Sequence, residues 1–251
     1  MKIDLAGRTA LITGGNRGLG EAMSSALAQA GAAVALVARD AARLEKVKAA
    51  ITASGGTAES FTADVTNEQD VAAVCDAVKR TLGSVDILIN NAGTNLRKKI
   101  TDFSLAEFRG VIDSSLISTF LMSRAIVPQM RGRGYGRIIN MTSIMSHVSL
   151  PERTAYSSAK SALLGFTRAL ALELAPDGIT VNGISPGPFM TEMNAAVINN
   201  PDANRQFLAS LPVGRWGEAQ EIGALACYLC SEAAAFLTGT DIVIDGGWTA
   251  K

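Results

Sequence analysis

The chain has 251 residues, of which 48% are apolar, and its 23 basic residues are balanced by 23 acidic ones. This length suits one α/β domain, and no linker, repeat or low-complexity tract divides the sequence, so we expect a single domain over residues 1–251. A net charge of zero argues against a nucleic-acid partner, which would need a basic face.

The first residues, Met1-Lys2-Ile3-Asp4, contain no apolar signal core, and we find no run long and apolar enough to span a bilayer. We therefore expect a cytoplasmic protein with no membrane partner. Three cysteines, an odd number in a chain without an export signal, argue against a disulfide framework.

Segments rich in valine, isoleucine and leucine alternate with longer stretches of helical period. This alternation is typical of repeated βα units and predicts an α/β fold with a doubly wound parallel sheet and helices on both faces. The expected strands are Thr9–Ile12, Ala33–Ala38, Thr57–Ala63, Ile87–Asn90, Gly136–Met141, Thr180–Ile184 and Ile242–Ile244. A capping box at Ser104-x-x-Glu107 and a stop signal at Asp177-Gly178 mark two helix boundaries.

The glycine-rich stretch Thr13–Gly20 lies at the first strand-to-helix junction, where a doubly wound sheet binds its dinucleotide. Glycines there allow positive φ and close approach of a pyrophosphate to the helix N-terminus. The spacing G-x-x-x-G-x-G differs from the broad dinucleotide fingerprint, so the alternative is a glycine-rich turn without a ligand. The expected cofactor-binding residues of this loop are Gly14, Asn16, Arg17, Gly18, Leu19 and Gly20.

Arg39 ends the second strand, at the place where an acidic residue would bind the ribose 2′-hydroxyl of NAD. An arginine fork matches a 2′-phosphate, and Arg17 could add a second positive charge, so the pair favours NADP(H). The alternative is that both arginines are solvated surface residues.

Two further segments follow predicted strands, namely Asp64-Val65 and Asn90-Asn91-Ala92-Gly93. The carboxyl ends of strands are where ligands gather in such sheets. On physical grounds alone the two segments could equally be a helix N-cap and a tight turn.

Ser143, Tyr156 and Lys160 form the predicted catalytic group. Tyr156 and Lys160 are four residues apart and share a helix face, and Ser143 lies just past the fifth strand. A phenol with a pKa of about 10 needs a nearby cation to act at neutral pH, and Lys160 can be that cation. Ser143 would hold a carbonyl oxygen that Tyr156 protonates while nicotinamide gives hydride to the carbon. The alternative is an ordinary exposed helix face.

Cys227 and Cys230 lie inside an apolar helical stretch, so we expect buried structural cysteines and no metal site. The irregular stretch Met190–Ser210 is a candidate substrate lid, with a pair of short helices covering the sheet edge as the alternative.

In their order along the chain, Thr13–Gly20, Asn90–Gly93, Ser143, Tyr156–Lys160 and the ending Asp245-Gly246-Gly247-Trp248 resemble the short-chain dehydrogenase/reductase family. The resemblance covers nearly the whole chain. It implies one Rossmann-like domain, usually with seven parallel strands, assembled as a homotetramer or, alternatively, a homodimer.

The resemblance also implies cofactor contacts. Asp64 and Val65 would contact the adenine, and Tyr156 and Lys160 the nicotinamide ribose. Asn91, Ala92 and Gly93 would line the cofactor, and Pro186, Gly187, Phe189 and Thr191 would fix the carboxamide.

Ser115 departs from the family pattern, because the family usually has an asparagine here that bends the helix and holds a water in the proton relay. A serine hydroxyl is shorter but can bond the same water. We therefore expect slower turnover rather than none.

The sequence is similar to gluconate 5-dehydrogenases and to 3-oxoacyl-carrier-protein reductases, which leaves two substrate classes open. Asn95-Leu96-Arg97-Lys98 resembles a segment of the sugar-acid group, and Arg97 could hold a substrate carboxylate. His147 and Arg153 lie on a loop expected to rim the pocket. The alternative for all three is solvated surface, and a scaffold or sensor without catalysis is the competing class of function.

Overall fold

The computed structural model of the protein describes residues 3–250, apart from the side chains of residues 193 and 196. Its centre is a sheet of seven parallel strands in the order β3-β2-β1-β4-β5-β6-β7. The strands are β1 (Thr9–Thr13), β2 (Ala33–Ala38), β3 (Thr57–Thr62), β4 (Ile87–Asn90), β5 (Gly136–Met141), β6 (Ile179–Pro186) and β7 (Asp241–Ile244). The predicted Rossmann-like α/β fold is confirmed.

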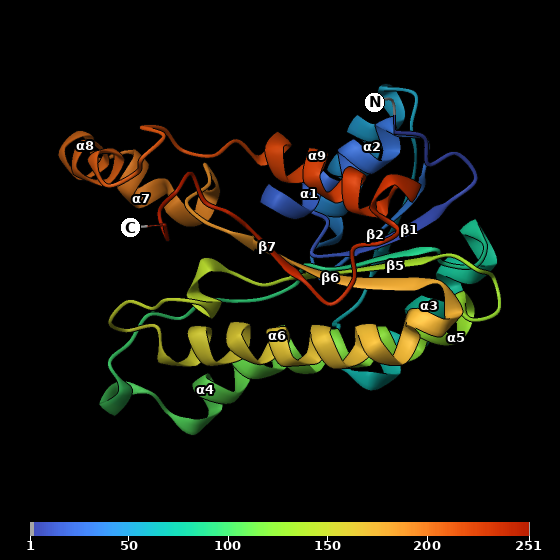
Figure 1. Cartoon of the computed structure of the whole chain (residues 1–251), viewed down its shortest axis with the longest axis horizontal. Coiled ribbons are helices and arrows are strands. Elements are labelled where there is room, and N and C mark those ends of the chain that lie inside the picture. Colours follow the sequence, from blue (N-terminus) through green and yellow to red (C-terminus); the bar gives the residue numbers. More distant parts are fainter. Residues whose placement is uncertain (1–2, 251) are drawn as a thin grey trace.

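Helices cover both faces of this sheet, as Figure 1 shows, with α1, α2 and α9 on one face and α3, α5 and α6 on the other. The helices are α1 (Gly18–Gln29), α2 (Ala41–Ala53), α3 (Glu68–Leu82), α4 (Leu105–Ile112), α5 (Ser118–Met130), α6 (Thr154–Leu174), α7 (Ala195–Ile198), α8 (Pro201–Ala209) and α9 (Ala219–Cys230). Helix α4 packs on α6, and α7 and α8 lie beyond the sheet near the C-terminus.

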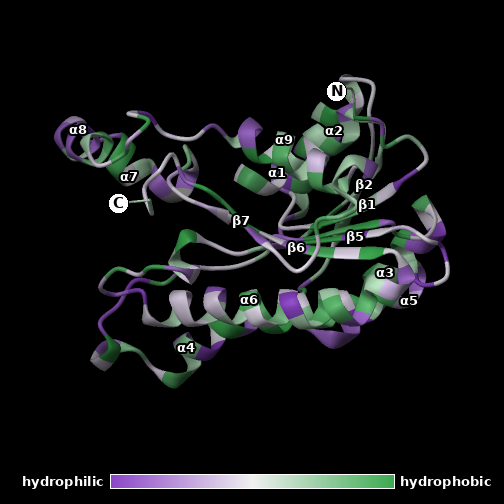
Figure 2. Cartoon of the chain, in the orientation of Figure 1, coloured by the Kyte–Doolittle hydropathy of each residue, from purple (hydrophilic) through white to green (hydrophobic). Residues whose placement is uncertain are grey.

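The core has two apolar layers, one on each face of the sheet, because side chains alternate along each strand. Ile12 and Leu36 point to the face that carries α1 and α9, whereas Leu11 and Val37 point to the face of α3 and α5. Because successive side chains of a strand alternate between faces, a strand buried on both sides must be apolar throughout. The central strands accordingly form the apolar interior in Figure 2.

The predicted helix boundaries are confirmed by hydrogen bonds. The Ser104 hydroxyl accepts from the Glu107 N–H at 3.2 Å, and the Glu107 carboxylate accepts from the Ser104 N–H at 2.9 Å. Helix α6 continues into a 3₁₀ turn and ends at Gly178, which has a left-handed φ of 72°. β6 is longer than predicted because its ladder with β7 extends to Pro186.

The expectation that no run is long and apolar enough to span a bilayer was wrong. The helical stretch Leu105–Met130 is long and apolar enough, by composition, to cross a membrane. A π-helical turn, Asp113–Ile117, joins α4 to α5 without a break, which the sequence pattern did not indicate. Met122, Ile126 and Met130 of this stretch are fully buried against the sheet, so it is a core helix.

The three cysteines are free and buried. Burial raises the pKa of Cys75 to about 12 and that of Cys227 to about 11, so both thiols stay protonated at neutral pH. Protonated, buried thiols are unreactive, which agrees with the structural role expected for Cys227 and Cys230.

Asp86 joins the start of β4 to the start of β1. Its carboxylate is 1% exposed, accepts from the Thr9 N–H at 2.9 Å and lies 2.9 Å from an Arg133 guanidinium nitrogen. Removing the carboxylate leaves the buried Thr9 N–H without its acceptor, whereas the partly exposed Arg8 and Arg133 can be hydrated. We expect Asp86→Ala to lower the free energy of unfolding by about 1–3 kcal/mol, measured by urea denaturation.

The exposed Asp76 of α3 provides the control, since Asp76→Ala should change this free energy by less than about 0.5 kcal/mol. Equal effects of the two substitutions would contradict the role of Asp86.

Candidate active site

The glycine loop between β1 and α1 has the conformation that a phosphate cradle requires. Gly14 and Gly18 have φ of 64° and 56°, in the region that favours glycine. A Cβ at position 20 would lie 2.2 Å from the Gly14 carbonyl oxygen, so only glycine fits there. A Cβ at position 18 would meet nothing closer than Thr191 Cγ2 at 3.9 Å, so the loop faces open space with Thr191 on its far side.

The end of β4 braces this loop. The Thr13 hydroxyl accepts from the backbone N–H groups of Asn91 and Ala92, each at 3.0 Å. The Asn91 side-chain amide donates to the carbonyls of Thr13 and Gly14 at 2.9 and 3.1 Å. Helix α1 begins without a side-chain cap at Arg17, which leaves its first N–H groups for an anion. These residues fit the phosphates of a dinucleotide.

Three arginines flank the cofactor side of the loop. Arg39 lies 3.7 Å from the Asp64 carboxylate, and Arg17 and Arg43 lie 3.6 and 3.1 Å from the carboxylate of Glu192. Their side chains are 74%, 62% and 44% exposed. Sequence analysis missed Arg43, whose only local signal is its place in the first turn of α2 behind the Asp40 N-cap.

Asp64 itself forms a short turn with Thr66, whose N–H and hydroxyl donate to its carboxylate at 2.9 and 2.7 Å. These two bonds, helped by the charge of Arg39, lower the pKa of Asp64. The N-cap of α3 is Asn67, so the cap reading considered for Asp64 does not apply. Val65 is buried beside this turn.

The structure brings Ser143, Tyr156 and Lys160 together at the carboxyl end of β5. The Ser143 hydroxyl accepts from the Met145 N–H at 3.1 Å and hydrogen-bonds the Tyr156 phenol. Lys160 is one turn along α6, its ammonium 5.8 Å from the centre of the Tyr156 ring and 2.5 Å from the Met141 carbonyl oxygen that accepts from it. All three residues were predicted from the sequence.

Burial dominates the titration of this group. It raises the pKa of Tyr156, and the Ser143 hydrogen bond and the Arg153 guanidinium oppose that rise. Burial also lowers the pKa of Lys160 to about 8. The Arg153 guanidinium is thus a second cation that favours the Tyr156 phenolate, in addition to Lys160, which the sequence predicted for this role.

Ser115 lies in the π-helical turn between α4 and α5, where the helix is distorted. Its side chain is buried and its hydroxyl has no hydrogen-bond partner among the described residues. A Cβ at Gly93 would lie 3.1 Å from this hydroxyl and 3.7 Å from the Lys160 ammonium. The hydroxyl and the ammonium thus flank the Gly93 backbone.

Arg97 and Arg153 meet where two loops join. The Lys98 N–H donates to the Glu152 carbonyl at 3.3 Å, and Leu96 packs in the same apolar cluster as Tyr156. Burial and the charge of Arg97 lower the pKa of Arg153. Arg97 itself is exposed.

Two buried atoms in this region have no partner among the described residues, namely Arg153 Nη1 and Asn95 Oδ1. Glu152 has a φ of 66°, and it is the one non-glycine residue of residues 3–250 in the left-handed region. Such a strained residue persists only where its surroundings hold it. The Arg153 guanidinium thus presents a buried nitrogen that lacks an anion.

His147 does not join Arg97 and Arg153 but pairs with a residue of β7. Its Nε2 is 2.7 Å from a carboxylate oxygen of Asp241, the first residue of β7. The contact to Asp241 was not predicted, because nothing in the sequence marks that aspartate.

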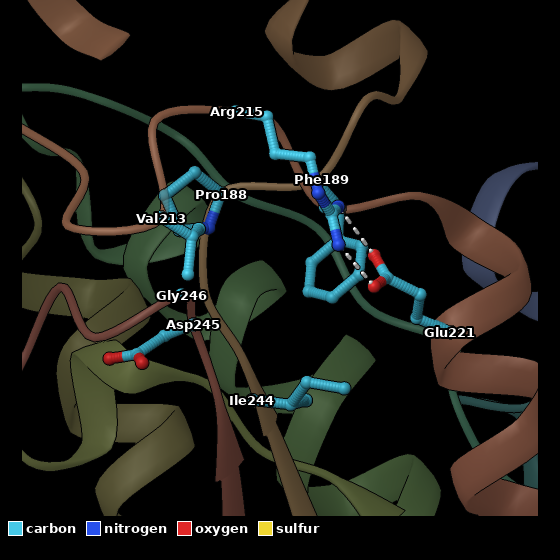
Figure 3. A pocket seen from close by; sticks show the side chains of 9 residues that line it. Pro188, Phe189, Val213, Arg215, Glu221, Ile244, Asp245 and Gly246 are labelled. Atoms are coloured by element: carbon cyan, nitrogen blue, oxygen red, sulfur yellow. Dashed lines mark hydrogen bonds and ion pairs between the residues drawn. The ribbon is translucent and has the colours of Figure 1, made fainter. Parts of the chain in front are cut away.

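The end of β6 and the segment after it carry Pro186, Gly187, Phe189 and Thr191. A Cβ at Gly187 would lie 2.4 Å from Asp245 Cβ, so glycine lets the C-terminal segment pass. Phe189 is 3% exposed and its ring packs on Gly217. Figure 3 shows this ring in a pocket beside the Arg215–Glu221 ion pair.

The candidate lid comprises a 3₁₀ turn, α7 and α8. The Phe207 ring of α8 stacks on Trp216 at 4.5 Å, and the Trp216 indole N–H donates to Asn204 at 2.7 Å. Glu192, just before α7, pairs with Arg17 and Arg43. This segment therefore spans from the cofactor loop to Trp216.

Comparison with known proteins shows the family to which the chain belongs. A family model described as enoyl-(acyl carrier protein) reductase matches residues 14–249. Gluconate 5-dehydrogenase of Gluconobacter oxydans is 33% identical over 247 residues, 98% of this chain and 96% of that protein. A 3-oxoacyl-[acyl-carrier-protein] reductase of Pseudomonas aeruginosa is 35% identical over 246 residues, 98% of each protein.

A solved structure is also closely similar. Gluconate 5-dehydrogenase from Burkholderia cenocepacia, in complex with NADP and tartrate, has a TM-score of 0.94 and 32% identity, and the match covers 100% of this chain and 98% of that one. The chain belongs to the short-chain dehydrogenase/reductase family. It is an NAD(P)-dependent oxidoreductase that acts on a small molecule.

The buried ammonium of Lys160 should destabilise the cofactor-free protein. Its folded pKa of about 8 lies below the ordinary value of 10.5, so the unfolded chain binds more protons between these pH values. We expect Lys160→Met to raise the free energy of unfolding at pH 7 by on the order of 1–3 kcal/mol, and this gain to shrink as the pH rises from 8 to 10.5.

Urea denaturation across this pH range measures the effect, with Lys46→Met on exposed α2 as the control that should show no such trend. Destabilisation by Lys160→Met at pH 7 would mean that the hydrogen bond to Met141 outweighs burial.

Proposed function

We propose that the protein is an NADP(H)-dependent oxidoreductase that interconverts a ketone and an alcohol on a small sugar acid, as a gluconate 5-dehydrogenase does. The observation that carries the substrate class is the buried, unpartnered Arg153 nitrogen beside Arg97 and Tyr156. Two guanidinium groups at the catalytic tyrosine suit a substrate with a carboxylate, because arginine forms short, paired hydrogen bonds with that group.

In this proposal Ser143 and Tyr156 act on the substrate carbonyl. The Ser143 hydroxyl accepts from the Met145 N–H and bonds the Tyr156 phenol, so its single proton would turn from Tyr156 to the carbonyl oxygen when a substrate binds. Tyr156 delivers the proton to that oxygen, and NADPH, when bound, supplies the hydride. Lys160 and the Ser115 hydroxyl, on either side of Gly93, return a proton to Tyr156 through a water.

The proposed cofactor contacts come from residues at the same edge of the sheet. Gly14, Asn16, Gly18, Leu19 and Gly20 hold the pyrophosphate, and Asp64 and Val65 the adenine. Asn91, Ala92 and Gly93 line the nicotinamide half, and the backbone of Pro186, Gly187 and Phe189 with the Thr191 side chain fixes the carboxamide.

The second candidate is a 3-oxoacyl thioester reductase. The Pseudomonas aeruginosa relative and the matching family model bear acyl-carrier-protein names, and they support it. The paired guanidinium groups favour the acid, because a neutral thioester leaves the buried Arg153 nitrogen without an anion. A scaffold without catalysis is disfavoured, because cofactor binding alone does not require Ser143 and Tyr156 to hydrogen-bond.

We also propose a cytoplasmic homotetramer as the working form, and three exposed apolar side chains support the assembly. Ile117 at the end of the π-helical turn, Phe120 of α5 and Leu172 of α6 are 38%, 42% and 80% accessible. Apolar side chains of this size on neighbouring helices suit burial against another subunit.

NADP(H) preference rests on Arg39 and Arg17, with Arg43 as a third cation. Loss of a charge-assisted bond to the 2′-phosphate should cost about 10- to 100-fold in affinity. We therefore expect Arg39→Asp to reduce the ratio of kcat/KM for NADPH to that for NADH by about this factor.

Arg80→Asp at the exposed end of α3 is the control and should leave the ratio unchanged. If Arg39→Asp also leaves it unchanged, the assignment of the 2′-phosphate to Arg39 is wrong.

The substrate class is tested by the initial rate of NADPH oxidation with 5-ketogluconate and, in parallel, with an acetoacetyl thioester. We expect faster turnover of the keto acid. Arg153→Gln and Arg97→Gln should each raise KM for the keto acid by about 10-fold or more and leave KM for the thioester unchanged.

Lys99→Gln removes an exposed positive charge two residues from Arg97 and is the matched control. Tyr156→Phe should lower turnover of either substrate by about 100-fold or more. Faster turnover of the thioester, with no effect of either arginine, would place the protein among the acyl reductases.

A further inference from the structure

A cluster of polar side chains from three neighbouring strands surrounds the main chain of Ser143. Its centre is the carboxylate of Asp241, whose side chain is 10% exposed. One carboxylate oxygen lies 2.5 Å from the Thr142 hydroxyl. The other lies 2.6 Å from the Ser185 hydroxyl and 2.7 Å from His147 Nε2.

The backbone of β6 is shaped to receive this carboxylate. A Cβ at Gly183 would lie 2.1 Å from Asp241 Oδ1, so any other residue would displace the aspartate. Ser185 and Thr142 are buried at 0% and 3% exposure. The cluster is therefore a packed part of the interior and not a chance surface contact.

The number of available protons decides how the cluster bonds. Its acceptors are both carboxylate oxygens of Asp241 and the carbonyl oxygens of Ser143 and Ile184. The Ser143 carbonyl oxygen lies 2.9 Å from the Ser185 hydroxyl, and the Ile184 carbonyl oxygen lies 2.6 Å from the Thr142 hydroxyl. Each hydroxyl has a single proton. Ser185 can donate to Ser143 only if another donor satisfies Asp241 Oδ2, and His147 is the group placed to do so.

We propose that His147 and Asp241 form a positioning pair for Ser143. With its proton on Nε2, His147 donates to Asp241, which leaves the Ser185 proton for the Ser143 carbonyl. The Met145 N–H holds the Ser143 hydroxyl from the other side. Ser143 is thus fixed at both ends, and its hydroxyl stays directed at Tyr156. This proposal rests on the role of Ser143 in the proposed function but not on the substrate.

The composition of the cluster also matches that of a hydrolytic Ser-His-Asp triad, but its geometry does not. A triad uses the two ring nitrogens for different partners. Here Nε2 alone lies 2.7 Å from Asp241 and 3.3 Å from the Ser185 hydroxyl. Because Ser185 is fully buried, it is also closed to a substrate.

Steady-state kinetics with NADPH and the best carbonyl substrate provide the test. We expect His147→Leu to lower kcat about 10-fold, the equivalent of one hydrogen bond, and to leave KM for NADPH unchanged. His147→Gln should restore most of kcat, since its amide can donate from the position of Nε2. Val148→Ala, an exposed change in the same loop, is the control.

The route through Ser185 is tested by combining variants. If His147 acts through Ser185, His147→Leu with Ser185→Ala should be no slower than Ser185→Ala alone. The proposal would be overturned if the double variant lost kcat by the product of the two single-variant factors. It would also be overturned if His147→Gln failed to restore kcat.

Ser143→Ala separates this proposal from the proposed function. Normal turnover of Ser143→Ala would mean that the role of Ser143 is wrong. Loss of turnover in Ser143→Ala with normal turnover in His147→Leu would overturn the positioning pair alone. Crystal structures of the Leu and Gln variants give a readout independent of activity, because only the Leu variant should move the Ser143 hydroxyl away from Tyr156.

Discussion

The hydrogen bonds between the ends of β1 and β4 hold the junction on which the rest of the site depends. Thr13 accepts from two N–H groups of the segment after β4, and Asn91 donates to two carbonyls of the glycine loop. The strand order reverses between these two strands, so the loops that follow them diverge and leave a crevice. Because all strands are parallel, the loops after β5 and β6 reach the same edge.

At this edge several buried polar groups lack hydrogen-bond partners or have shifted pKa values. Burial lowers the pKa of the Lys160 ammonium and raises the pKa of the Tyr156 phenol. Arg153 Nη1 and the Ser115 hydroxyl have no hydrogen-bond partner among residues 3–250. A buried polar group without a partner is destabilising. Such groups gather where a ligand can supply the missing bonds, which is why the same residues support the function.

The segment after β6 connects the two halves of the site. Thr191 faces the glycine loop, and Glu192 pairs with Arg17 and Arg43 beside it. Farther along, α8 packs on Trp216 through stacked rings. These contacts hold the segment of short helices at both of its ends.

The sequence by itself determined the strands, the capping box, the glycine loop and the spacing of Tyr156 and Lys160. These features depend on local period and on residues close together in the chain, so the pattern predicts them directly. It also predicted that Cys227 and Cys230 are structural, because they lie on an apolar helix.

Only the tertiary structure decided which distant residues meet. It placed Arg43 beside Arg17, buried one Arg153 nitrogen next to Tyr156, and paired His147 with Asp241, 94 positions later in the chain. It also joined α4 to α5 through the π-helical turn at Ser115, which makes one long core helix. Burial and long-range contact set the charge state and the partners of these residues, and neither is encoded in the spacing of a single chain segment.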